Sequence, residues 1–170
     1  MGIMDDLGNL AKQFASGAAS ETDVHNTFDQ TARSVPQTSI ADALSHTFNS
    51  DQTPPFEQML SNLFKQSTPE QKATILNQIT TALGSAGVAS AASGGLAGLK
   101  GVLAGGDVTP QQAQQVTPQQ VQVLAQQAAK KNPSIVDQAA SFYAQHPTLV
   151  KTIGAGALAL LMSRISQARR

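Results

Sequence analysis

The pattern of apolar and polar residues is helical along most of the chain, and its most apolar run is Pro147–Ser163. No residue from Thr152 to Ser163 is charged, so we expect a helix that is apolar on every side and therefore buried. Because a membrane span needs about 20 apolar residues, we expect this helix to pack inside one subunit or between subunits. The residues expected to mediate self-association are Gly154, Ala155, Gly156, Ala157, Leu158, Leu160, Leu161 and Met162.

The first half of the chain shows apolar residues at amphipathic helical spacing. One predicted helix spans residues 3–16, and the next follows the capping residue Ser20 and ends near Arg33. A third is expected to be capped by Thr38 or Ser39, and a fourth to start at Thr53-Pro54.

Three copies of a Thr-Pro-x-Gln motif, at Thr68, Thr109 and Thr117, predict helix starts. The threonine caps the helix, proline tolerates the first helical position, and glutamine reaches back to the cap. The helix that begins after Thr68 is expected to stop at Gly84. Further helices are expected before Asn132 and over residues 134–145, and no segment reads as a strand. The predicted fold is therefore an all-α, multi-helix bundle of eight or nine short helices with a C-terminal apolar helix.

Residues 84–106 hold eight of the thirteen glycines. We expect either a packed helix from about residue 86 to 104 or a flexible linker, because each glycine costs up to about 1 kcal/mol of helix propensity. The glycines expected to allow close helix packing are Gly94, Gly98, Gly101 and Gly105. The sequence thus divides into an amphipathic helical region (1–83), a Gly/Ala-rich helix or linker (84–107) and a Gln-rich and apolar helical region (108–170).

Charge is sparse and unevenly distributed. Residues 1–60 carry two cationic and eight anionic side chains, a net charge of −6, whereas residues 107–170 carry six and two, a net charge of +4. These regions either attract each other, within a chain or between chains, or form two solvated surfaces that never meet. The acidic start of the chain, with no apolar core after it, predicts a bacterial-type cytoplasmic protein, and export by a route that needs no such signal is the alternative.

Candidate catalytic and metal-binding chemistry is limited. Asp42 and His46 could share a helix face, but a metal needs three or four ligands and no second pair is visible. Residues 154–159 match the letters G-x-G-x-x-A without the βαβ context that a dinucleotide site requires. The chain has no cysteine and no G-x-S-x-G motif. We therefore predict a protein that is not an enzyme and has no cofactor, metal or small-molecule substrate.

Nucleic acid and the membrane surface are two other classes of partner. With one Tyr, no Trp and few basic residues, the chain offers little for nucleic acid binding. A peripheral membrane protein is the alternative, in which the C-terminal helix inserts shallowly and Arg164, Arg169 and Arg170 contact anionic head groups. That helix has no Trp anchor, which favours burial in protein.

The start M-G-I-M-D-D-L, the A-D-A-L at 41–44 and the predicted helices around Phe56–Phe64 and Ile75–Leu83 resemble YidB-like bacterial proteins. The resemblance covers residues 1–85, while the two V-T-P-Q-Q octads and the H-P-T-L-V-K segment depart from the family's pattern. It implies a small all-helical bacterial cytoplasmic protein and supplies no catalytic residues. The residues themselves predict a self-associating structural or scaffolding protein, whose partner is another copy of the same chain.

Overall fold

The structure, a computed structural model, describes residues 9, 12, 13, 16, 17, 20–93, 96–103 and 107–168. Every element in these ranges is a helix, so the predicted multi-helix all-α fold is confirmed. The helix predicted over residues 3–16 lies largely outside the described residues. The chain forms two compact units, one from 1–55 with 140–170 and one from 56–139.

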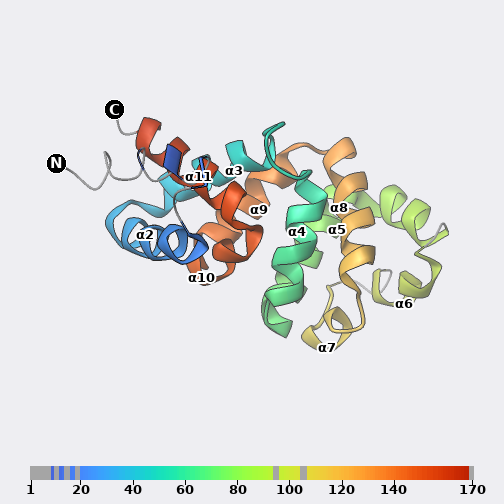
Figure 1. Ribbon diagram of the computed structural model, residues 1–170. Coiled ribbons are helices and arrows are strands. Elements are labelled where there is room, and N and C mark those ends of the chain that lie inside the picture. Colours follow the sequence, from blue (N-terminus) through green and yellow to red (C-terminus); the bar gives the residue numbers. More distant parts are fainter. Residues whose placement is uncertain are drawn as a thin grey trace. The chain divides into compact units, whose positions relative to one another are not determined.

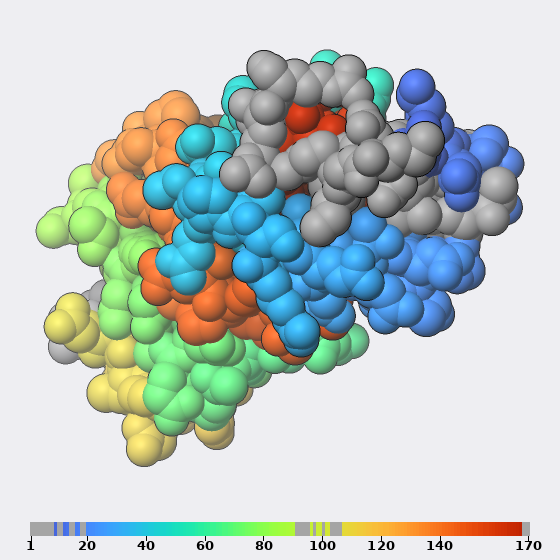
Figure 2. Space-filling view, turned by 90° about the vertical axis from the view of Figure 1, so that its left-hand side faces the viewer, coloured from blue at the N-terminus to red at the C-terminus, as the bar shows by residue number. Residues whose placement is uncertain are grey.

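The first unit joins helices from both ends of the chain. Its elements are α2 (Glu21–Ser34), α3 (Gln37–Phe48), α10 (Pro147–Val150), η2 (Lys151–Ile153) and α11 (Ala155–Ala168). Helix α11 packs against α3 and α2 (Figure 1). In the space-filling view, the blue and cyan atoms of α2 and α3 lie directly against orange-red and red atoms of the C-terminal segment (Figure 2).

The core of this unit follows the predicted helical spacing. Val24 and Phe28 of α2 are fully buried, as are Leu158 and Leu161 of α11. Full burial of such a side chain stabilises the fold by about 1.5–3 kcal/mol. The stability of the unit therefore depends on a helix that comes from the far end of the chain.

The second unit is built around α8. It contains α4 (Phe56–Gln66), α5 (Pro69–Ser93), η1 (Ala97–Leu99), α6 (Lys100–Leu103), α7 (Pro110–Ala113) and α8 (Pro118–Lys131). Helix α8 packs against α4 and α5, and α5 also contacts α7 (Figure 1). The boundary with the first unit falls inside α9 (Ser134–Ala144), between Ala139 and Ala140.

The predicted capping motifs form as hydrogen-bonded pairs. Thr68, Thr109 and Thr117 each accept a bond from the backbone N–H three residues on, and the glutamine there accepts one from the threonine N–H. Ser20 and Asp23 form the same reciprocal pair at the start of α2. These four starts confirm that local cap chemistry sets the helix boundaries.

Two other predicted starts differ from the structure. Helix α3 begins at Gln37 after Pro36, and neither Thr38 nor Ser39 caps it. Pro36, with φ −60° and ψ 148°, takes the extended backbone of the residue before a helix and makes no side-chain cap. Thr53 does not start α4, because its hydroxyl donates instead to the carbonyl oxygens of Thr47, at 2.6 Å, and Ser50. Two prolines then separate Thr53 from the first helical residue.

Gly84 interrupts α5, as the sequence predicts. Its φ of 71° and ψ of 173° lie in a region open essentially to glycine alone. Helix resumes after it and runs to Ser93, so the single helix predicted from about residue 86 to 104 is wrong. Between Ser93 and Asp107, the described residues form only the short η1 and α6, consistent with the low helix propensity of glycine.

A second glycine breaks the C-terminal run. The sequence predicts one helix from Pro147 to Ser163, but Gly154 takes a φ of 104° between η2 and α11. The predicted continuous helix is therefore wrong in its first half. Apolar periodicity did not reveal this break, because the residues on both sides of Gly154 are compatible with a helix.

The compact units also differ from the division expected from composition, at residues 83 and 107. Composition changes along the chain mark local segments, whereas packing brings residues 140–170 together with residues 1–55. The Gly/Ala-rich segment is accordingly part of the second unit and not a connection between domains.

Candidate self-association surface

Helix α11 has a buried side and an exposed side, and we call the exposed side the outer stripe. The buried side chains come from residues spaced around about two thirds of the helix circumference, at 100° per residue. They are Ala155, Ala157, Leu158, Ala159, Leu161, Met162, Ile165 and Ser166. The remaining side carries exposed Gly156, Arg164 and Gln167 with half-buried Leu160 and Ser163. The helix is thus not buried on every side, contrary to expectation.

The residues predicted to mediate self-association fall into two groups. The structure buries Ala155, Ala157, Leu158, Leu161 and Met162 in the chain's own core. Gly154 and Gly156 are exposed and Leu160 is half-buried. Contacts within one chain therefore account for the apolar character of the first group, and the second group remains accessible to another chain.

The outer stripe of α11 is open at Gly156, and the space beside Gly154, the residue before the helix, is open as well. A Cβ added at Gly154 or Gly156 would meet no atom within 4 Å. These glycines therefore do not provide close helix packing inside the chain. An added Cβ at Gly156 therefore has free space in this chain.

Two glycines of the second unit, Gly98 and Gly101, show the same openness. Gly98 and Gly101 are exposed and have no atom within 4 Å of an added Cβ. Gly94 and Gly105 lie outside the described residues. The expected close packing at Gly98 and Gly101 is therefore not found among the described residues.

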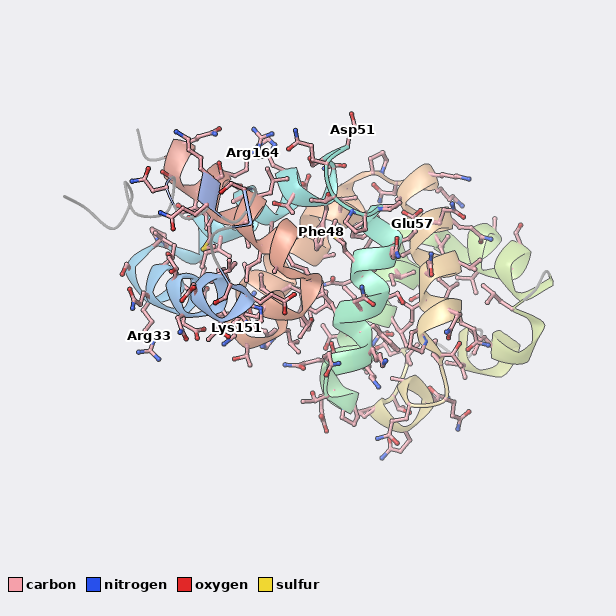
Figure 3. All side chains as sticks on the ribbon, viewed as in Figure 1. Arg33, Phe48, Asp51, Glu57, Lys151 and Arg164 are labelled. Atoms are coloured by element: carbon pink, nitrogen blue, oxygen red, sulfur yellow. The ribbon has the colours of Figure 1, made fainter. Side chains whose placement is uncertain are left out.

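The acidic front and basic back of the chain meet in the first unit. Lys151 of η2 donates to Asp29 of α2 at 2.9 Å, with their side chains 24% and 41% exposed. Figure 3 shows Lys151 beside α2 and Arg164 directed away from the helices. The first unit carries six cationic and seven anionic residues (net −1), and the second carries five and four (net +1). The first unit thus brings anionic residues of the front together with cationic residues of the back, and each unit is nearly neutral.

Four titratable side chains bear on the candidate chemistry: two are exposed on α3 and two make local contacts. Asp42 and His46 are both exposed on α3, and the described residues contain no group of three or more potential metal-ligating side chains. The Ser20 hydroxyl and backbone N–H donate to Asp23 at 2.8 and 3.1 Å and lower the pKa of its carboxyl. His146 packs against the Phe142 ring, with centroids 5.0 Å apart.

Three features escaped the sequence patterns. The Asn77 side chain forms hydrogen bonds with the backbone of Val108. The Lys131 ammonium lies next to Gly84, where an added Cβ would be 3.7 Å from it. Val123 is 41% exposed on α8, the one large apolar side chain at the surface of the described residues. Asn77 and Lys131 act across packed helices, so local spacing could not indicate their partners.

Comparison with known protein families, curated proteins and solved structures finds no match. The resemblance to YidB-like proteins therefore stays a prediction, apart from its implied all-helical fold. None of the described helices is both long enough and apolar enough to cross a membrane.

Proposed function

We propose that this protein is a non-enzymatic structural or scaffolding protein that associates with copies of itself through the outer stripe of α11. The observation that carries this proposal is the open space at Gly156, four residues before half-buried Leu160 on the same side of α11. Small residues allow another backbone to approach closely, and Leu160 supplies apolar area at the centre of such a contact.

The use of polar side chains supports a structural role. Threonine, serine and glutamine side chains cap the helices, and Asn77 joins α5 to the residue before Thr109. Buried hydroxyls of Thr31 and Thr47 donate to carbonyl oxygens four residues earlier. The polar groups in these contacts hold the helices in place.

Sedimentation analysis over a range of protein concentrations tests the proposal. Wild-type chains should associate, and Gly156→Asp should weaken association at least tenfold, because two aspartates would face each other across the close contact. The control Gln30→Asp places the same charge on the exposed side of α2 and should leave association unchanged. A wild-type chain that is monomeric at every concentration contradicts the proposal.

The membrane alternative has a separate outcome. The apolar side of α11 already contributes to the core of the first unit, so lipid insertion would require that helix to leave α2 and α3. Sedimentation with anionic liposomes separates the two functions. If the protein pellets only when liposomes are present, the membrane function is supported and self-association is rejected.

A further inference from the structure

We draw no further inference here: the strongest candidate, the Lys131 ammonium beside Gly84 and Gly87 where the second part of α5 begins, is an exposed lysine at a helix start, and no other observation among the described residues indicates a ligand there.

Discussion

Asn77 and Val108 are joined by two hydrogen bonds although 31 positions separate them in the chain. The Asn77 side chain accepts from the Val108 N–H at 2.7 Å and donates to the Val108 carbonyl oxygen at 3.3 Å. An amide side chain presents the same donor and acceptor as a backbone, so it can satisfy both groups of one residue. This contact holds the segment after the Gly/Ala-rich region against α5.

We expect Asn77→Ala to destabilise the protein by about 1–3 kcal/mol, because it leaves the part-buried backbone groups of Val108 without these partners. Urea unfolding measured by circular dichroism gives the free energy. The matched control is Asn62→Ala on the exposed side of α4, expected to change stability by less than about 0.5 kcal/mol. Equal effects at the two positions would show that the Asn77 contact adds nothing to the free energy of unfolding.

The pair Lys151–Asp29 should contribute little by itself. Because its carboxylate is 41% exposed, we expect a coupling of about 0.2–1 kcal/mol, and less at high salt. A double-mutant cycle with Asp29→Asn and Lys151→Met measures that coupling separately from other effects of each substitution. A coupling well above this range would mean that the pair is screened from solvent more than its exposure indicates.

Gly84 should tolerate a side chain poorly. Gly84→Ala forces a residue with a Cβ into a region that only glycine enters readily, at a cost of about 1–3 kcal/mol. The control Gly98→Ala adds a methyl group in open space at a residue without positive φ, and is expected to be neutral or stabilising by up to about 1 kcal/mol. Thermal melting of the two variants checks the contrast, and similar melting temperatures would contradict it.

The sequence predicts the helices well because their signals are local. The caps at Thr68, Thr109 and Thr117 each need only residues within one turn. The core positions of α5 and α8 likewise follow from periodicity, since one apolar stripe identifies the buried side of a helix. The break at Gly84 was predicted from the end of such a stripe.

The candidate site was predicted less well. Apolar composition identified α11 as a packing helix but could not tell a core that it shares with α2 and α3 from a contact between chains. The same limitation hid the pairing of Lys151 with Asp29, because distant segments meet only in the folded chain. Val123 adjoins Leu124 and Ala125 in the sequence, but it lies outside the helical spacing of the buried residues Val121, Leu124, Ala125 and Ala128 and is exposed.

Acid should weaken the start of α2 through Asp23. The pKa of its carboxyl is lowered in the folded chain by the Ser20 hydroxyl and N–H, so the ionised form stabilises the fold. That contribution is present above the ordinary pKa of 3.8 and is lost as pH falls below it toward the lower folded value. Unfolding measured from pH 6 to pH 2 should show less acid dependence in Asp23→Asn than in wild type. Asp42→Asn on the exposed side of α3 is the control. Equal acid dependence in wild type and Asp23→Asn would show that stability does not depend on ionisation of the Asp23 carboxyl.

Substitutions at neighbouring positions 156 and 157 should distinguish packing of α11 in the core from association through its outer stripe. Ala157 is 5% exposed in the core of the first unit, whereas Gly156 next to it is exposed with no atom within 4 Å of an added Cβ. Ala157→Asp would bury an unpaired carboxylate, at a cost of several kcal/mol unless it takes up a proton. We expect this variant to lose cooperative melting of the first unit, measured by circular dichroism.

Gly156→Asp should behave in the opposite way. An aspartate there is solvated, lies in the first turn of α11 and is favoured by the helix dipole, so melting should match or exceed that of wild type. Light scattering should nevertheless show weaker association, because the same carboxylate lies on the outer stripe. If Gly156→Asp instead melts as early as Ala157→Asp, the outer stripe is part of the core. If both variants keep wild-type stability, α11 is not packed against α2 and α3.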